Sequence, residues 1–148
     1  MRISTKGRYA LRVLLDLARH QGDGYIPLKA VAERENISKQ YLDQIMIILN
    51  RTDYLKSTRG ARGGYRLAKT PDKYRLGDIL RLTEGSIAPL ACLENNGEDC
   101  SRSSDCAARC VWQGLGQLIA DYLDRTTLQS ILDQYDNKGL GGQISLER

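Results

Sequence analysis

Two short amphipathic segments joined by a tight turn constrain the fold of this chain more than any other feature. Pro27 is well placed to open a helix that runs through Glu35, and Ser38 is a good N-cap for a second helix that ends near Asn50. Apolar residues recur at helical spacing on one side of each segment: Leu28, Val31 and Ala32, then Leu42, Ile45, Ile48 and Leu49. This pattern predicts a helix-turn-helix.

A glycine-rich hairpin follows the two helices. Residues 54–58 and 64–68 are typical of short strands, and three glycines within residues 60–64 give the backbone the freedom that a tight turn needs. Arg59 and Arg62 fall in this turn. The sequence therefore predicts a wing with two arginines at its tip.

The remaining segments complete a mainly α-helical chain with a small β-hairpin. We expect a further helix over residues 5–19, and residues 85–105 lose helical periodicity. The expected architecture is a winged helix-turn-helix plus a long C-terminal dimerisation helix. Its divisions are a DNA-binding domain at 1–75, a connecting helix and cysteine loop at 76–104, a dimerisation helix and short return helix at 105–135, and a disordered tail at 136–148.

The long helix, expected over about residues 105–125, carries a broad apolar stripe. Its members are Trp112, Leu115, Ile119, Tyr122 and Leu123. A fold this small offers little surface that could cover these apolar side chains. We therefore expect the helix to pair with its symmetry mate in a homodimer. Packing back onto the N-terminal domain is the alternative.

Charge is divided unevenly along the chain. The overall formal charge is +4, but residues 1–75 hold 16 Lys and Arg against 7 Asp and Glu, whereas residues 76–148 hold 6 against 11. Lys and Arg that neutralise phosphates release condensed counterions, so the basic part favours a polyanionic partner. A solvated basic face is the alternative that charge alone leaves open.

The second helix of a helix-turn-helix presents its N-terminal residues to the major groove. Gln40 and Gln44 have the amides that recognition of adenine requires, and Lys39 suits a phosphate. Asp43 is either an acceptor for the cytosine amino group or an ordinary surface charge, and the wing arginines suit a minor groove. The expected DNA contacts are Arg2, Lys6, Ser38, Lys39, Gln40, Tyr41, Asp43, Gln44, Arg59 and Arg62.

Two other classes of protein fit the sequence poorly. The N-terminus lacks the features of a signal peptide, and the longest apolar run, Ile45–Leu49, is far shorter than the roughly 18 residues of a membrane span. We therefore expect a cytoplasmic protein with no membrane partner. We expect no enzyme either, because His20 is the single histidine and no C-x-x-C pair follows a βαβ pattern.

All four cysteines fall in one window: Cys92, Cys100, Cys106 and Cys110. Disulfides are disfavoured in the cytoplasm, so this clustering indicates metal or redox chemistry. The spacing differs from the paired C-x-x-C of zinc ribbons, although zinc in an irregular loop stays open. Thiolates also ligate iron–sulfur clusters.

Three ordered motifs carry a resemblance to a known family. They are Met1-Arg2-Ile3-Ser4-Thr5-Lys6-Gly7-Arg8-Tyr9-Ala10, Ile37-Ser38-x-x-Tyr41-Leu42-x-Gln44 and Arg59-Gly60-x-x-Gly63-Gly64-Tyr65-x-Leu67. The chain from Met1 to about Leu132 resembles the Rrf-two family of bacterial regulators, whose types include IscR, NsrR and CymR. The resemblance implies a homodimeric winged-helix repressor or dual regulator of double-stranded operator DNA, with the long C-terminal helices at the dimer interface.

The resemblance also implies a cofactor. In IscR-like and NsrR-like members, three cysteines between the wing domain and the dimer helix hold an iron–sulfur cluster. This assigns Cys92, Cys100 and Cys106 as cluster ligands in the present chain. A 2Fe-2S cluster is favoured, and a 4Fe-4S cluster stays open.

The fourth ligand departs from the family pattern. Arg109 stands where IscR-like members have histidine, and Arg8 stands where NsrR-like members have aspartate. Cys110 is the replacement that we expect, because a cysteine four residues after Cys106 shares one helix face with it. A small thiol packed beside Trp112 is the alternative for Cys110.

These features together predict a dimeric repressor whose operator binding is controlled by an iron–sulfur cluster. The repressor would sense the iron–sulfur status of the cell, redox state or nitric oxide. The alternative is a CymR-like regulator of cysteine and sulfur metabolism, controlled without a cluster by a metabolic-enzyme partner or by thiol oxidation. The stretch Glu84-Gly85-x-Ile87-x-Pro89 resembles CymR and favours this alternative.

Overall fold

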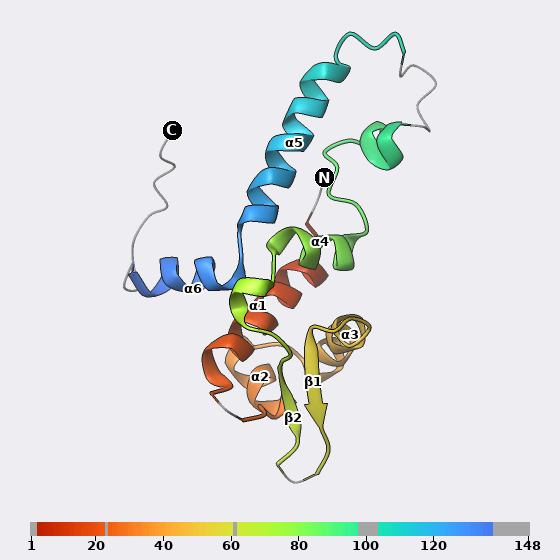
Figure 1. The fold of residues 1–148 in the computed structure, drawn as a ribbon. Coiled ribbons are helices and arrows are strands. Elements are labelled where there is room, and N and C mark those ends of the chain that lie inside the picture. The colour runs from red at the N-terminus through yellow and green to blue at the C-terminus, as the bar shows by residue number, and fades with distance from the viewer. Residues whose placement is uncertain (1–2, 23, 61, 98–103, 138–148) are drawn as a thin grey trace.

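The computed structural model describes residues 3–22, 24–60, 62–97 and 104–137 (Figure 1). Within them the chain forms six α-helices and one antiparallel hairpin, which confirms the expected mainly α-helical class. The elements are α1 (Thr5–His20), α2 (Leu28–Glu35), α3 (Lys39–Leu49), β1 (Leu55–Thr58), β2 (Gly64–Leu67), α4 (Leu76–Glu84), α5 (Arg109–Arg125) and α6 (Leu128–Asn137), with 3₁₀ turns η1 (Pro71–Lys73) and η2 (Ala91–Gly97). We call α1, α2, α3 and the hairpin the reading head.

The turn between α2 and α3 is fixed by local backbone chemistry. Asn36 adopts the left-handed conformation, with φ 51° and ψ 49°, and its N–H bonds to the carbonyls of Ala32 and Glu33. Ser38 then accepts the N–H of Tyr41 at 3.3 Å and caps α3, as the sequence predicts. Asparagine tolerates the left-handed region better than most residues with a side chain, so the turn stays tight.

α1 lies at the centre of the reading head. Its Val13, Leu14 and Leu17 are fully buried in the hydrophobic core. Asp16 is also buried, and Arg34 of α2 donates two hydrogen bonds of 2.7 Å to its carboxylate. A buried charge is costly unless it is paired. This bidentate pair therefore fixes α2 against α1.

A buried tyrosine holds the base of the hairpin. β1 and β2 pair with Leu55 opposite Leu67. Tyr74 is fully buried, and its hydroxyl donates to the carbonyl oxygen of Tyr54 at 2.6 Å and accepts the N–H of Lys69 at 3.0 Å. The hydroxyl thus ties both ends of the hairpin to the segment that leads into α4.

α5 extends away from the reading head (Figure 1). Its only buried residue is Leu123. Leu76 donates its N–H to the carbonyl of Thr126 at 2.8 Å, and Leu128 donates its N–H to the carbonyl of Tyr74 at 3.0 Å. These bonds fix the base of α5 beside the start of α4. None of the helices in the described residues has the length and apolar character needed to cross a membrane.

Three boundaries differ from the sequence-based expectation. The long helix begins at Arg109, four residues later than expected, because no side chain caps its start and a turn precedes it. The expected loop at 85–105 contains η2. α6 continues to Asn137, into the tail expected at 136–148, and residues 138–148 lie outside the described residues.

Tyr74→Phe is expected to lower the free energy of unfolding by about 1–3 kcal/mol. The variant keeps the ring but leaves the N–H of Lys69 without its acceptor. Urea denaturation followed by circular dichroism measures the change. Tyr135→Phe, at a ring that is 47% exposed, is the matched control and should change stability by less than about 0.5 kcal/mol. Equal stability of the two variants would show that the Tyr74 hydroxyl contributes nothing.

Candidate nucleic-acid interface and cysteine segment

The outer side of α3 is polar. The opposite side is buried in the core through Leu42, Ile45 and Leu49. Because this apolar side fixes the helix, the polar side chains project into solvent, where a duplex can approach. Five of the six contacts predicted for this helix are exposed: Ser38, Lys39, Gln40, Asp43 and Gln44.

Tyr41, the sixth predicted contact, is half-buried. Its ring meets the ring of Tyr9 edge-on, with the centroids 5.7 Å apart, and the Arg12 guanidinium lies 4.9 Å from the centroid of Tyr9. Such a pair is favourable, so Tyr41 positions the start of α3 against α1. Lys6 is half-buried on α1, one helical turn before Tyr9, and Arg2 lies outside the described residues.

The tip of the hairpin presents two arginines. Arg59 and Arg62 are exposed on either side of the turn. Gly60 has φ 108°, a conformation that residues with side chains rarely adopt. A Cβ at Gly63 would lie only 2.7 Å from the carbonyl oxygen of Thr58. Glycine at these two positions therefore holds the arginines at the tip.

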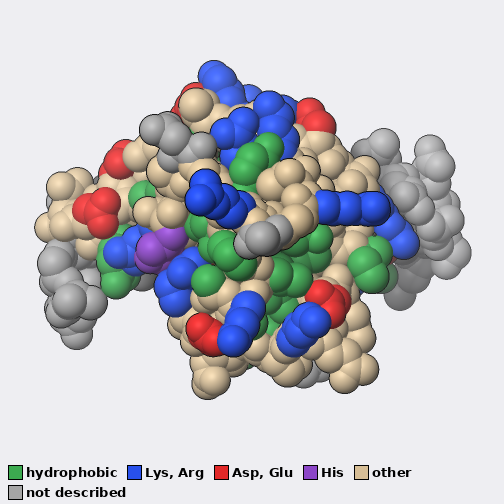
Figure 2. Space-filling model, turned by 90° about the horizontal axis from the view of Figure 1, so that it is seen from below, with side chains coloured by type: hydrophobic (Ala, Val, Ile, Leu, Met, Phe, Trp, Pro, Cys, Tyr) green, Lys and Arg blue, Asp and Glu red, His purple; other side chains and the backbone are tan. Residues whose placement is uncertain are grey.

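Basic side chains of this face are available to an anion. In the described part of the chain, no salt bridge involves Lys39, Arg59 or Arg62. The hairpin end of the molecule carries many Lys and Arg side chains (Figure 2). Lys56 on β1 is exposed as well, and the DNA contacts expected from the sequence do not include it. The signal for it is the alternation of a strand, which turns Lys56 away from the half-buried Leu55.

We call residues 92–110 the cysteine segment. Its described parts, residues 92–97 and 104–110, lie at the end of the molecule opposite the hairpin (Figure 1). Cys92 is in η2, Cys106 is in the turn before α5, and Cys110 is in the first turn of α5. All three are exposed and free of disulfides. Cys100 lies outside the described residues.

The helix face expected to be shared by Cys106 and Cys110 is not formed. α5 begins at Arg109, so Cys106 precedes the helix, and its carbonyl accepts the N–H of Arg109 at 3.0 Å. Cys110 is exposed, which argues against a thiol packed beside Trp112. Among residues that the structure describes, no three side chains of His, Cys, Asp or Glu gather closely enough for a metal ion.

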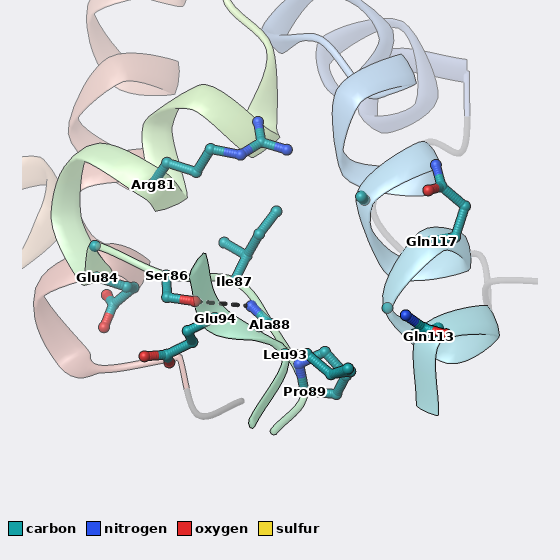
Figure 3. A pocket seen from close by; sticks show the side chains of 13 residues that line it. Arg81, Glu84, Ser86, Ile87, Ala88, Pro89, Leu93, Glu94, Gln113 and Gln117 are labelled. Carbon is teal, nitrogen blue, oxygen red and sulfur yellow. Dashed lines mark hydrogen bonds between the residues drawn. The ribbon is translucent and has the colours of Figure 1, made fainter. Parts of the chain in front are cut away.

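A cleft of about 1040 Å³ separates the end of α4 from α5 (Figure 3). Pro89 and Leu93 approach α5 at Gly116, where an added Cβ would lie 3.4 Å from the Pro89 ring. The segment that leads from α4 to η2 therefore packs directly on α5. The rest of the cleft is lined by both polar and apolar side chains, and the longest polar ones are Arg81, Glu84, Gln113 and Gln117.

A bidentate ion pair, which we call the clasp, joins α4 to α5. Arg81 donates to the two carboxylate oxygens of Asp124 at 2.7 and 2.9 Å. Its hydrogen bonds hold the pKa of Asp124 below the ordinary value, and Asp124 raises the pKa of Arg81. Gly77 makes the contact possible, because a Cβ there would collide with the Asp124 carboxylate.

The outer surface of α5 is apolar. Its large apolar side chains are 39% to 69% exposed and recur at helical spacing. A contiguous exposed stripe of this kind marks an interaction surface. Its members are Val111, Trp112, Leu115, Leu118 and Tyr122.

Comparisons with known proteins cover nearly the whole chain. The Rrf2 family model, described as an iron-dependent transcriptional regulator, matches residues 3–134. The HTH-type transcriptional regulator CymR of Bacillus subtilis (strain 168) is 38% identical over 138 residues, covering 93% of this chain and 94% of CymR.

Two solved structures have similar folds. The structure of CymR (YrzC), the global cysteine regulator of B. subtilis, aligns with a TM-score of 0.75 at 38% identity and covers 92% of this chain and 99% of that chain. The structure of T. potens IscR aligns with a TM-score of 0.76 at 33% identity and covers 97% of this chain and 94% of that chain.

The clasp predicts a pH-dependent contribution to stability. The folded pKa of Asp124 is lowered, so the clasp stabilises the fold above the ordinary carboxyl pKa and loses this effect as pH falls through the lowered value. Both side chains are 37% exposed, so solvent screening limits the effect to about 0.5–1 kcal/mol. Urea denaturation should show Asp124→Asn less stable than wild type at about pH 7, with a smaller difference near pH 3.

The control for this measurement is Asp121→Asn, which removes a 3.6 Å ion pair with Arg125 but keeps an amide oxygen that can accept the hydrogen bond from Gln117. Its stability difference from wild type should be small at both pH values. A difference between wild type and Asp124→Asn that stays constant with pH would contradict the role of the clasp.

Proposed function

Because this chain belongs to the Rrf2 family of DNA-binding transcription regulators, we propose that it is a homodimeric repressor whose operator affinity is controlled through the cysteine segment. The observation that carries the proposal is the exposed polar side of α3, together with hairpin arginines that no carboxylate neutralises in the described residues. A helix held by its apolar side and presenting amides outward is suited to base readout.

The protein reads the operator through contacts in both the major and the minor groove. α3 enters the major groove, where the amides of Gln40 and Gln44 donate to and accept from adenine, and Lys39 meets a phosphate. Arg59 and Arg62, held at the hairpin tip, enter a neighbouring minor groove, where negative potential is focused. Base contacts supply sequence preference, and the basic side chains supply most of the salt-dependent affinity.

Dimerisation uses the apolar stripe of α5. The same stripe on a second copy, related by a two-fold axis, covers these side chains and removes them from water. Two reading heads then stand at a fixed separation. This separation sets the spacing of the two operator half-sites.

The cysteine segment has thiols that are accessible to solvent and chemically suited to bind an iron–sulfur cluster. Thiolates are the usual ligands of such clusters, and the three described cysteines are exposed and unpaired. We assign Cys92, Cys100 and Cys106 as ligands, with Cys110 as the fourth, and a 2Fe-2S cluster as the favoured form. A bound cluster supplies a redox-active centre that is sensitive to oxidants, nitric oxide and iron supply.

Contacts within the chain connect the cysteine segment to the reading head. Pro89 and Leu93 pack on α5 at Gly116. At the end of α4, the Glu84 carboxylate accepts a hydrogen bond of 2.8 Å from the hydroxyl of Ser4, the N-cap of α1. A displacement of the segment after α4 therefore reaches both α5 and the first turn of α1.

A second candidate is a regulator of cysteine metabolism that works without a cluster. It is favoured by the 38% identity with CymR. In this case the exposed thiols themselves respond to oxidants, or a partner enzyme binds the regulator.

Removing a hairpin arginine is expected to lower the salt dependence of DNA binding. For a duplex recovered from a random-sequence pool, Arg59→Ala should reduce the slope of log K against log salt by about 0.9 for each phosphate that the arginine neutralises. Fluorescence anisotropy titrations at several salt concentrations measure the slope. Arg125→Ala, which removes an 81% exposed charge at the end of α5, should leave it unchanged. Equal slopes for wild type and Arg59→Ala would exclude Arg59 from the interface.

Anaerobically purified protein is expected to contain iron, acid-labile sulfide and visible charge-transfer absorption. Cys92→Ala and Cys106→Ala should lose all three, because each removes a thiolate ligand. Cys110→Ala should lower the iron content if this residue is the fourth ligand. Ser104→Ala, an exposed position in the same segment, is the matched control and should retain the cluster.

The same protein distinguishes the two candidates. Operator affinity measured before and after removal of iron by a chelator should differ if a cluster controls binding. Wild-type protein without iron or sulfide would refute cluster control. Full regulation by a Cys92→Ala, Cys106→Ala double variant would favour the partner-controlled repressor.

A further inference from the structure

One large apolar side chain is exposed in the last turn of α3. Ile47 is 56% exposed, whereas its neighbours Ile45 and Met46 are 1% and 2% exposed. Ile47 therefore contributes nothing to the hydrophobic core that fixes the other side of the helix. The side chain is instead accessible to whatever approaches α3 from outside.

Helical geometry places Ile47 on the side of α3 that carries the proposed DNA contacts. It follows Gln40 by seven residues, Asp43 by four and Gln44 by three, so the four side chains share one face. The three polar members are exposed too. Isoleucine has one strongly preferred χ1 rotamer in a helix, so its methyl groups hold a defined position on this face.

The major groove offers one apolar group for such a side chain, the C5-methyl group of thymine. We propose that Ile47 contacts the C5-methyl group of a thymine in each operator half-site and so determines base preference there. This inference rests on the proposed placement of α3 in the major groove. A single isoleucine among polar residues is too small a patch for a protein partner, but a methyl contact needs only one apolar side chain.

The position of this thymine follows from helix dimensions. Seven residues of α-helix rise about 10 Å, and stacked base pairs rise about 3.4 Å each. With α3 lying along the groove, the thymine of Ile47 stands about three base pairs from the base pair that Gln40 contacts. Gln40 and Ile47 thus contact base pairs at opposite ends of one short stretch of the half-site.

The test removes the thymine methyl group and the isoleucine separately. A duplex is selected from a random-sequence pool with wild-type protein, and each thymine is replaced in turn by deoxyuridine. At one thymine per half-site, wild type should bind deoxyuridine about fourfold more weakly, the value of one buried methyl group. Ile47→Ala should bind both duplexes equally, and Ile47→Val should keep most of the difference.

Gln44→Ala is the matched control on the same face. It should weaken binding while keeping the effect of deoxyuridine, because it leaves Ile47 in place. Thermal unfolding of Ile47→Ala should resemble wild type, since the side chain lies outside the core.

Two outcomes separate this inference from the proposed function. If Gln40→Ala and Gln44→Ala weaken binding but every thymine methyl contributes equally in wild type and Ile47→Ala, the role of Ile47 is wrong and readout by α3 stands. If the wild type selects no sequence, or the glutamine variants bind as wild type does, major-groove readout by α3 fails, and the inference fails with it.

Discussion

The clasp between Arg81 and Asp124 is the side-chain contact that holds α5 in its direction relative to α4. α5 buries only Leu123, so apolar packing alone holds it weakly against the rest of the chain. Its direction is set instead by two charge-assisted hydrogen bonds and by the backbone bonds at its base. Gly77 allows this close approach, because any larger residue would occupy the place of the Asp124 carboxylate. A small residue in α4 thus decides where a long helix points.

α1 carries this arrangement to the recognition helix. Its N-cap Ser4 is bonded to Glu84 at the end of α4, and a little more than one turn later Tyr9 meets Tyr41 at the start of α3. One rigid helix therefore contacts both the element that bears the clasp and the element proposed to read DNA. A shift of α4 relative to α1 can therefore act on the start of α3 through the contact between Tyr9 and Tyr41, at the edge of the hydrophobic core.

The sequence predicted the helix-turn-helix within one or two residues because its signals are local. Ser38 caps α3 through its own side chain, and the turn before it is set by a neighbouring asparagine. The start of α5 was misplaced because no side chain caps it, and Cys106 was therefore wrongly assigned to a helix. The half-burial of Tyr41 depends on which helices pack together, and no local pattern reveals that, whereas helical spacing alone already leaves Ile47 outside the apolar side of α3.

The length of α5 makes the clasp an effective control point. Seventeen helical residues span about 25 Å, so a tilt of about 10° at the base moves the far end by about 4 Å. This displacement is close to the rise of one base pair, about 3.4 Å. In a dimer joined through α5, a tilt of this size would change the separation of the two reading heads by about one base pair. Such a change would alter how well both heads fit the grooves of one operator. The cysteine segment meets α5 at its far end, and the segment after α4 packs on it near Gly116. Under the proposed function, a signal at the cysteine segment would tilt α5 over its full length and would need no rearrangement within α3.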